Sequence, residues 1–360
     1  MTQRRSFRVV LITLILCSTT AVFAGEPGEE ESSGWWNQPY PQPFDASGLT
    51  MTLDTVSVDG NRFVDEAGNT MIFKGVSIAD PDKLVKNGHW SKSHFEVVKE
   101  WGANVVRVPV HPVAWRGRGK RGYFELLDQA VVWATELELY LMIDWHSIGN
   151  PLSGMYQHPM YDTTGLETRA FWRAISHRYQ GIPTVAFYEI YNEPTRYNGT
   201  LGYAAWDDWK TFNEEVISII YAHDTNVVPL VAGFDWAYEL RSVSDSPIDA
   251  EGIGYVSHPY PMKVKPPYEE KWERDFGYVA NTYPVFVTEF GFTRAENPDA
   301  HIPVVADEEY PEAIITYFDK KGISWAAWCF DPKWGPLLIS DWEYTPTESG
   351  AFFRSKMLGE

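Results

Sequence analysis

Cysteine is almost absent from this sequence: among 360 residues only Cys17 and Cys329 are present. Cys17 lies in an amino-terminal apolar run with the features of an export signal, so the processed chain would keep Cys329 alone. One cysteine cannot form an intramolecular disulfide. Cys329 lies in the apolar run ISWAAWCF, which favours a small core residue over a thiol nucleophile. We therefore expect a fold that depends on its hydrophobic core.

Basic residues are also in the minority, with 30 Lys and Arg against 49 Asp and Glu and a formal net charge of −19 at pH 7. A chain of this charge repels the phosphates of nucleic acids and the surface of anionic membranes. We therefore expect neither a nucleic-acid nor a membrane partner. The acidity suits a neutral or basic polymer as the ligand, and we expect a monomer.

The apolar run near the amino terminus is too short to span a bilayer. This run, residues 9–17, follows arginines at positions 4, 5 and 8 and precedes Val22-Phe23-Ala24, whose small residues suit a signal peptidase. A charged segment, a short apolar segment and a cleavage site predict a signal peptide over residues 1–24. The protein is therefore expected to be secreted, with cleavage after Ala24.

Residues 25–44 lack hydrophobic periodicity. Their first half, GEPGEEESSG, is acidic and rich in Gly and Ser, and their second half, WWNQPYPQPF, is aromatic and rich in Pro. This composition predicts a flexible leader, of which the aromatic half is also suited to pack on a domain. No later stretch has the composition of a linker, so we predict one domain over residues 45–360.

Motifs for cofactors and metals are missing as well. No glycine-rich phosphate loop follows an apolar run, and no HExxH or comparable ligand spacing occurs. We therefore predict a protein that uses no cofactor and no metal.

Aromatic residues, by contrast, are abundant: they make up 15% of the chain and include 16 Trp and 20 Tyr. Large aromatic side chains fill cores, and they also present flat apolar faces on which sugar rings stack. We expect several to line a substrate cleft. Those on predicted loops after strands are Trp115, Trp145, Tyr156, Trp236 and Trp334.

Apolar, strand-like runs alternate with amphipathic patterns along the predicted domain. The runs are MIFKGVS, NVVRVPV, LYLMIDWH, VAFYEIYNE, VVPLVAG, IGYVSHPY, PVFVTEFGF and ISWAAWCF. Apolar residues recur at helical spacing between several of them, as in residues 95–101, 127–137 and 209–220. Eight strands followed by helices predict an α/β (β/α)8 barrel. A doubly wound open sheet is the second possibility, and it lacks the phosphate loop expected there.

A short β-hairpin is predicted before the first of these strands. Residues 55–58 and 61–64 have strand character and flank Asp59-Gly60, a pair that favours a tight turn.

Polar side chains gather where the predicted barrel strands end. They are Arg107, His146, Asn192, Glu193, His258, Tyr260, Glu289 and Trp328. Barrel enzymes build their active sites at the carboxyl ends of the strands, and buried polar groups are costly unless they serve one another or a ligand.

Two carboxylates in this set indicate the chemistry. Glu193 ends the fourth predicted strand and Glu289 ends the seventh, so the two are expected to face each other across the barrel mouth. Such a pair hydrolyses glycosidic bonds, with retention of configuration when the carboxylates lie ~5–5.5 Å apart and inversion at ~6.5–9.5 Å. A structural alternative is that one of the two simply pairs with Arg107. Glu189 and Asp144 are expected to support the site from deeper in the barrel.

The motifs Asn192-Glu193-Pro194, His258-x-Tyr260 and Thr288-Glu289-Phe290-Gly291, with Arg107 and Trp328, resemble glycoside hydrolase family 5. The hairpin segment VSVDGNRFVDEAGNTMIFKGVS is also similar to the lead into the first strand in that family. The resemblance runs from about residue 53 to about residue 342, with these residues in order, one group for each strand end. It implies a retaining (β/α)8 β-glycanase.

The resemblance also implies a role for each site residue. Glu289 would be the nucleophile, held ionised by Arg107 and Tyr260, and Glu193 the acid and base. Asn192 would bond the sugar 2-hydroxyl, His146 and His258 would be hydrogen-bonding walls, and Trp328 would lie under the sugar ring at the reacting subsite.

The substrate is left open by the sequence. Tryptophans and the lack of a basic patch favour neutral β-1,4-glucan, and an endo-β-1,4-glucanase is the main expectation. Mannan, xyloglucan and mixed-linkage glucan remain alternatives, with β-mannanase the nearest. A non-catalytic carbohydrate-binding protein on a hydrolase scaffold is an alternative of another class. Asn198-Gly199-Thr200 is an acceptor for glycosylation only in a host that glycosylates.

Overall fold

The structure, a computed structural model, describes residues 34–195, 201 and 204–360. The predicted signal peptide at 1–24 and the glycosylation motif at Asn198 lie outside these residues. Residues 39–360 form a compact unit. Residues 34–38 belong to a separate unit and contain the short 3-10 helix η2 (Trp35–Asn37).

A closed barrel of eight parallel strands forms the centre of the compact unit, in the order β11-β12-β13-β14-β4-β5-β6-β9. Every run predicted as a strand contributes one of them, so the predicted (β/α)8 fold is confirmed. The strands are β4 (Lys74–Ile78), β5 (Val105–Val110), β6 (Tyr140–Trp145), β9 (Val185–Glu189), β11 (Val228–Ala232), β12 (Gly254–Val256), β13 (Val285–Phe290) and β14 (Ser324–Phe330).

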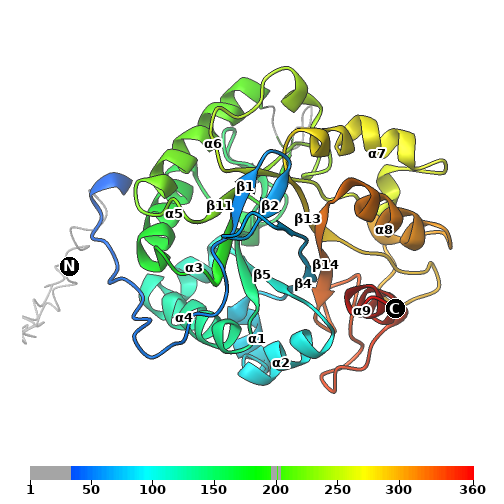
Figure 1. The fold of residues 1–360 in the computed structure, drawn as a ribbon, viewed down its shortest axis with the longest axis horizontal. Coiled ribbons are helices and arrows are strands. Elements are labelled where there is room, and N and C mark those ends of the chain that lie inside the picture. Colours follow the sequence, from blue (N-terminus) through cyan, green and yellow to red (C-terminus); the bar gives the residue numbers. More distant parts are fainter. Residues whose placement is uncertain (1–33, 196–200, 202–203) are drawn as a thin grey trace, which may run out of the picture. The chain divides into compact units, whose positions relative to one another are not determined.

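Helices surround this barrel (Figure 1). They are α1 (Pro81–Asn87), α2 (Lys92–Glu100), α3 (Pro112–Arg118), α4 (Lys120–Glu136), α5 (Gly165–Tyr179), α6 (Trp206–Tyr221), α7 (Glu269–Asp275), α8 (Tyr310–Lys321) and α9 (Glu348–Leu358). Short 3-10 helices occur in the connections, at η3 (Pro159–Tyr161), η4 (Arg241–Ser244), η5 (Pro261–Lys263), η6 (Gly277–Asn281) and η7 (Ile302–Val304). Among the residues that the structure describes, no helix combines the length and apolarity that crossing a membrane requires.

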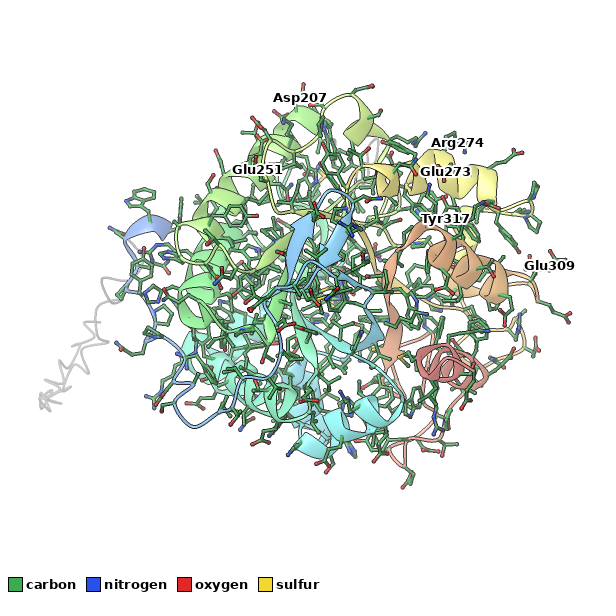
Figure 2. All side chains as sticks on the ribbon, viewed as in Figure 1. Asp207, Glu251, Glu273, Arg274, Glu309 and Tyr317 are labelled. Atoms are coloured by element: carbon green, nitrogen blue, oxygen red, sulfur yellow. The ribbon has the colours of Figure 1, made fainter. Side chains whose placement is uncertain are left out.

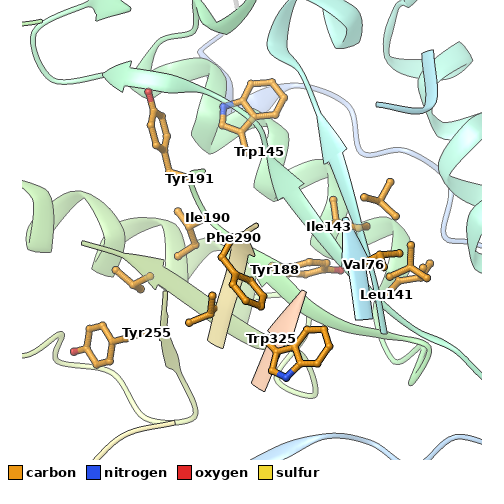
Figure 3. Close-up of a cluster of buried hydrophobic side chains, with 14 of the residues drawn as sticks. Val76, Leu141, Ile143, Trp145, Tyr188, Ile190, Tyr191, Tyr255, Phe290 and Trp325 are labelled. Atoms are coloured by element: carbon orange, nitrogen blue, oxygen red, sulfur yellow. The ribbon is translucent and has the colours of Figure 1, made fainter. Parts of the chain in front are cut away.

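The outward faces of the strands and the inner faces of the helices form one continuous core. Figure 3 shows part of it, where Trp325 of β14 lies near Phe290 of β13. Their ring centroids are 5.8 Å apart and the rings meet edge to face. Parallel strands are covered on both sides, which is why their sequences read as unbroken apolar runs.

Side-chain contacts also join neighbouring helices. Figure 2 labels Glu273 of α7 and Tyr317 of α8, and the Tyr317 hydroxyl donates to the Glu273 carboxylate at 2.6 Å. This bond holds α7 against α8.

The amino-terminal hairpin closes one end of the barrel. Strands β1 (Ser57–Asp59) and β2 (Arg62–Val64) pair antiparallel, as the sequence predicts, and β2 pairs further with β3 (Thr70–Met71). From β2 the Phe63 ring enters the barrel, 5.2 Å from Phe187 and 5.9 Å from Phe73, centroid to centroid. The hairpin therefore fills the end of the barrel that lies away from the strand carboxyl ends.

At the carboxyl ends, the regular alternation of side chains is interrupted. The register of β13 on β14 shifts between Val287 and Phe290. Phe286 faces the barrel interior and Phe290 the outer core, so strict alternation would turn Glu289 outward. The irregularity allows Thr288 and Glu289 to face inward together, as bulges near active sites do.

The end of the predicted leader lies against helix α5. The Phe44 amide donates to the Arg178 carbonyl at 2.7 Å, and Arg178 donates to the Gln42 carbonyl at 2.6 Å. Tyr40 stacks on His177 at 4.4 Å between ring centroids. Residues 40–44 thus continue the compact unit towards its amino terminus.

We predict that Phe63→Ala lowers the free energy of unfolding by about 3–5 kcal/mol, because it empties a buried aromatic position. Urea denaturation measures this loss. Arg62→Ala in the same strand is the matched control: its side chain is exposed and pairs with Asp59 at the surface, so the expected loss is below about 1 kcal/mol. Equal losses for the two variants would contradict the role given to Phe63.

Candidate active site

Arg107 of β5 is the buried cation of the barrel mouth. Its guanidinium donates to both carboxylate oxygens of Glu189, at 2.7 and 2.9 Å. It also lies 3.0 Å from Asp144 and donates to Glu289 at 3.2 Å. A buried charge is tolerated only when it is paired and hydrogen-bonded. Three carboxylates from β6, β9 and β13 meet this requirement, and they are thereby fixed in place.

Glu289 of β13 is held at both oxygens. Its Oε2 accepts from Arg107, and its Oε1 accepts from the Tyr260 hydroxyl at 2.8 Å. These are the two partners that the sequence analysis expected. The carboxylate is 7% exposed, so it reaches the cleft while its partners keep it oriented.

Glu193 does not end a barrel strand, contrary to the sequence-based description. Barrel strand β9 ends at Glu189, and Glu193 begins β10 (Glu193–Pro194), which pairs with β7 (Ile148–Asn150). A third short strand, β8 (Met155–Tyr156), completes this sheet. The segment remains extended because Ile190, Asn192 and Glu193 still donate backbone hydrogen bonds to neighbouring strands and their extensions.

His258 connects Glu193 to the barrel interior. Its Nδ1 lies 3.1 Å from Glu193 Oε1, and its Nε2 lies 2.9 Å from Thr288 Oγ1. One ligand atom from each of Glu193, His258 and Glu289 falls within 4.8 Å of the other two. The two glutamates are therefore close neighbours. A metal ion bound between these residues would have to replace the hydrogen bond between His258 Nδ1 and Glu193.

Asp144 holds the imidazole of His146, with Nδ1 2.6 Å from Asp144 Oδ2. The same ring lies parallel to Trp328, with centroids 5.3 Å apart and an interplanar angle of 3°. Trp328 belongs to β14, whose register on β4 also shifts, between Ala327 and Phe330. His146 and Trp328 thus form one aromatic wall of the site.

Asn192 has an oriented amide. Its Oδ1 accepts from Arg107 at 2.6 Å, which leaves Nδ2 as the free group. Nδ2 is buried without a hydrogen-bond partner. Buried donors are rarely left unpaired in proteins, so this amide is suited to donate to a ligand.

A cleft of about 540 Å³ opens over these residues. Its lining includes His146, Glu193, His258, Tyr260, Glu289 and Trp328, together with Tyr161, Trp236, Lys263 and Trp334. Arg107 and Asn192 lie beneath it, fully buried. The structure therefore brings all eight sequence-predicted site residues to one place.

The predicted loop aromatics divide into two groups. Trp236 and Trp334 line the cleft. Trp115 and Trp145 do not: both are buried against Phe171, and Trp145 stacks on it at 4.1 Å. Tyr156 donates its hydroxyl to the Thr163 carbonyl. Trp115, Trp145 and Tyr156 are thus structural in the described chain.

A half-buried lysine beside the cleft was missed by the sequence analysis. Lys83 Nζ lies 3.4 Å over the Trp334 ring and 3.3 Å from His111 Nε2. His111 Nδ1 in turn lies 3.0 Å from Asp80 Oδ2. Burial lowers the pKa of Lys83 to about 8. The available signal was Asp80, two residues after the first barrel strand, where it also caps α1 by accepting from the Asp82 amide.

Burial and like charge set the ionisation of the site. Burial raises the pKa of Glu289 to about 7, with Glu193 adding to the effect and His258, Arg107 and Tyr260 opposing it. Burial alone would lower the pKa of His258, but the carboxylates of Glu189, Glu193 and Glu289 raise it to about 9. Arg107 holds the pKa of Glu189 below its usual value against the effect of burial. Glu189 is thus the permanent anion, while the ionisation of His258 and that of Glu289 depend on each other.

This geometry defines a class: a (β/α)8 barrel with two adjacent glutamates at its mouth, an arrangement typical of glycoside hydrolases. The comparisons with known proteins give the family. The family model for cellulase (glycosyl hydrolase family 5) matches residues 64–334. The chain belongs to glycosyl hydrolase family 5.

Solved structures and relatives matched by sequence agree with this assignment. A β-glucanase from Saccharophagus degradans, solved in complex with cellotetraose, is 49% identical, with a TM-score of 0.87 over 90% of this chain and 98% of that chain. The catalytic domain of endoglucanase Cel5A from Thermobifida fusca shares the fold, at 23% identity and a TM-score of 0.68 over 84% of this chain and 97% of that chain.

Endoglucanase A of Butyrivibrio fibrisolvens is 28% identical over 251 residues, which cover 67% of this chain and 53% of that protein. Endoglucanase A of Evansella cellulosilytica is 26% identical over 236 residues, 65% of this chain and 44% of that protein. The chain thus spans about half the length of these two relatives.

We predict that the free energy of unfolding of Glu289→Gln, relative to that of the wild type, is higher at pH 8 than at pH 5. The folded-state pKa of Glu289, about 7, lies above that of an unfolded glutamate, so its protonated form favours folding. That contribution is fully present below about pH 4.3 and is lost as the pH rises through 7. The wild type should therefore lose up to about 3 kcal/mol relative to the variant across this window.

Urea denaturation of both proteins at the two pH values measures the difference. Glu100→Gln, at an exposed site at the end of α2, serves as the control. Its free energy of unfolding should differ from that of the wild type by the same amount at both pH values. A pH-independent difference for Glu289→Gln would contradict the ionisation described here.

Proposed function

We propose that this protein is a secreted, retaining β-glycoside hydrolase, an endo-β-1,4-glucanase that acts by double displacement. Glu289 is its nucleophile and Glu193 its acid and base. The observation that carries the proposal is the pairing of these two carboxylates within 4.8 Å, each with different partners.

The spacing of the glutamates supports retention of configuration. Retaining enzymes place their carboxylates ~5–5.5 Å apart, while inverting enzymes leave ~6.5–9.5 Å for a water molecule. One oxygen of each glutamate lies within 4.8 Å of the other, which fits the shorter spacing.

The contacts of each glutamate support its role. In the first step Glu289 bonds the anomeric carbon, the glycosidic bond breaks, and Glu193 gives its proton to the leaving oxygen. Arg107 and Tyr260 aim Glu289 at that carbon through both of its oxygens. In the second step Glu193 takes a proton from water, the water oxygen bonds the anomeric carbon, and Glu289 is released.

The other site residues fit the reacting sugar. The free Nδ2 of Asn192 is placed to donate to the 2-hydroxyl, a bond that strengthens in the transition state. Trp328 offers an apolar face at the cleft, held against His146. Trp236 and Trp334 are suited to stack on sugar rings farther along the chain.

The relatives support a β-glucan as the substrate. The 49% identical protein is named a β-glucanase and was solved with cellotetraose, and the relatives matched by sequence are named endoglucanases. β-Mannanase activity is the nearest alternative. A non-catalytic binding protein is disfavoured because Glu193, Glu289 and their hydrogen-bond partners are all in place.

Export is part of the proposal and depends on the pattern of residues 1–24. Amino-terminal sequencing of the protein recovered from the culture medium should give Gly25 as the first residue.

We predict that purified enzyme releases reducing sugars from carboxymethylcellulose and barley β-glucan at least tenfold faster than from mannan, xyloglucan or xylan. The reducing-sugar assay on this panel, with Glu289→Gln as the blank, tests the substrate class. Fastest release from mannan would replace the glucanase proposal by β-mannanase. Binding to a polysaccharide without release of reducing sugars from any polysaccharide of the panel would favour the non-catalytic alternative.

We predict that the two glutamates fail differently. Glu193→Gln should lower turnover of polysaccharide by about 10²–10⁴-fold or more, because the general acid is lost. An activated aryl β-cellobioside needs no proton on its leaving group, so its first step should survive, and azide should restore turnover with a β-glycosyl azide as product. Glu289→Gln should abolish the reaction of both substrates.

Product analysis by proton NMR completes this test, since retention makes the β-anomer appear first. Azide rescue of Glu289→Gln, with Glu193→Gln inactive on the aryl glycoside, would reverse the two roles. An initial α-anomer would exclude double displacement.

A further inference from the structure

A continuous chain of hydrogen bonds connects the two glutamates through the barrel interior. It runs from Glu193 to His258, Thr288, Glu189, Arg107 and Glu289, with contacts of 3.1, 2.9, 3.0, 2.7 and 3.2 Å. Thr288 is the link to which no role has been given above. Its side chain is fully buried, as are those of Glu189 and His258, so no solvent competes for these bonds.

The direction of the bonds at Thr288 is fixed by its chemistry. A hydroxyl carries one proton, and an ionised carboxylate can only accept. Glu189 is held in its ionised form by two bonds from Arg107, so the Thr288 hydroxyl donates to Glu189 Oε1 at 3.0 Å. The Thr288 oxygen must then accept from His258, whose Nε2 therefore carries a proton.

A fixed proton at Nε2 decides what His258 offers to Glu193. A neutral imidazole has one protonated and one unprotonated nitrogen, so neutral His258 presents an unprotonated Nδ1, which accepts a hydrogen bond from the protonated carboxyl of Glu193. Charged His258 donates from Nδ1 to the Glu193 carboxylate. In both states one proton lies between Nδ1 and Oε1, which are 3.1 Å apart.

We propose that Thr288 is a positioning residue: anchored by Glu189, it fixes the Nε2-protonated tautomer of His258 and so keeps one transferable proton on the His258–Glu193 pair. The inference rests on the proposed function, because that proton is the one that the leaving group takes. Thr288 touches no reacting atom and acts through His258.

The proton count of the reaction closes with this arrangement. In the first step the glycosidic oxygen takes the proton of the pair, leaving Glu193 as carboxylate and His258 neutral with its proton on Nε2. In the second step water gives a proton to Glu193, and the pair regains what it lost. Had the neutral ring carried its proton on Nδ1, that nitrogen would donate to the Glu193 carboxylate without supplying the acid.

Other titratable and charged groups surround His258. The titratable groups that influence it are Glu189, Glu193, Glu289, Asp144 and His146, with Arg107 and Tyr260 bonded to the same carboxylates. Among them Glu189 comes within 3.6 Å of Nε2, which further favours a proton on that nitrogen.

Thr288→Val tests the proposal, since valine has the shape of threonine and can neither donate nor accept. The pH dependence of kcat/KM is measured for barley β-glucan and for an activated aryl β-cellobioside. We expect the alkaline limb for β-glucan to move down by about one pH unit, so that kcat/KM falls about tenfold at pH 8, with KM within twofold. The aryl glycoside, which needs no acid, should lose less than threefold in its first step.

Two further variants make the kinetic test specific. Thr288→Ser keeps the hydroxyl and should restore the wild-type profile. Thr293→Val removes a buried hydroxyl that bonds Asp299 and Asn297 instead, and its profile should match the wild type. A Thr288→Val profile that coincides with the wild type, or an equal loss on both substrates, would overturn the proposal.

A second test reads the tautomer in the wild-type protein and does not depend on the activity of any variant. Nitrogen-15 NMR of histidine-labelled enzyme reports the tautomer of each ring. The His258 signals are those that are missing from the spectrum of His258→Gln. We expect Nε2 of His258 to stay protonated from pH 6 to 10 while Nδ1 alone titrates. A neutral ring protonated on Nδ1 would overturn the proposal.

The outcomes separate this inference from the proposed function. Absence of hydrolysis by the wild type would defeat the function, while the NMR result would still decide the tautomer. Normal hydrolysis with an unchanged Thr288→Val profile would defeat only the role of Thr288.

Discussion

The buried guanidinium of Arg107 is the interaction on which the site depends. It is fully buried in β5 and contacts carboxylates from three other strands, Asp144, Glu189 and Glu289. Removing a buried cation's partners is costly, so the barrel mouth can hold several acids only while Arg107 holds them. The same group also orients Asn192 through its Oδ1. One side chain thereby sets the position of both the nucleophile and the amide that faces the sugar.

The barrel could be read from the sequence because its physical cause is local. Strands such as NVVRVPV and LYLMIDWH are buried on both faces, so they appear as continuous apolar runs of strand length. The polar residues at their ends were predictable for the same reason, since each interrupts an apolar run. What joins them was not predictable. That Glu189, and not Glu289, takes two bonds from Arg107 depends on the depth of each residue in the barrel.

Irregular backbone accounts for most of the side-chain positions that could not be predicted from the sequence. Strict alternation along β13 would send Glu289 outward, and only the register shift between Val287 and Phe290 brings it in beside Thr288. Glu193 likewise leaves the barrel ladder and pairs with β7 in a separate sheet. Tertiary packing, not residue type, produces both departures, and the contact of Lys83 with Trp334 has the same origin.

The turn that carries Trp236 shows how far the fold is constrained at the cleft. Asp235, Trp236 and Ala237 have φ angles of 61°, 58° and 56°, a left-handed conformation that costs about 1–3 kcal/mol for each such residue. The turn is held from three sides. The Trp236 amide donates to the Pro194 carbonyl, Lys263 donates to the Asp235 carbonyl, and the Trp236 indole donates to Gln157.

Pro194 directly follows Glu193, so the same backbone that places the proposed acid also anchors the tryptophan beside it. Strain of this kind persists only where surrounding contacts determine the conformation. A sugar ring that stacks on Trp236 would therefore meet a surface already fixed relative to Glu193. Substrate binding would then need little reordering of the cleft, and the alignment of a glycosidic oxygen with Glu193 would follow from the fold itself.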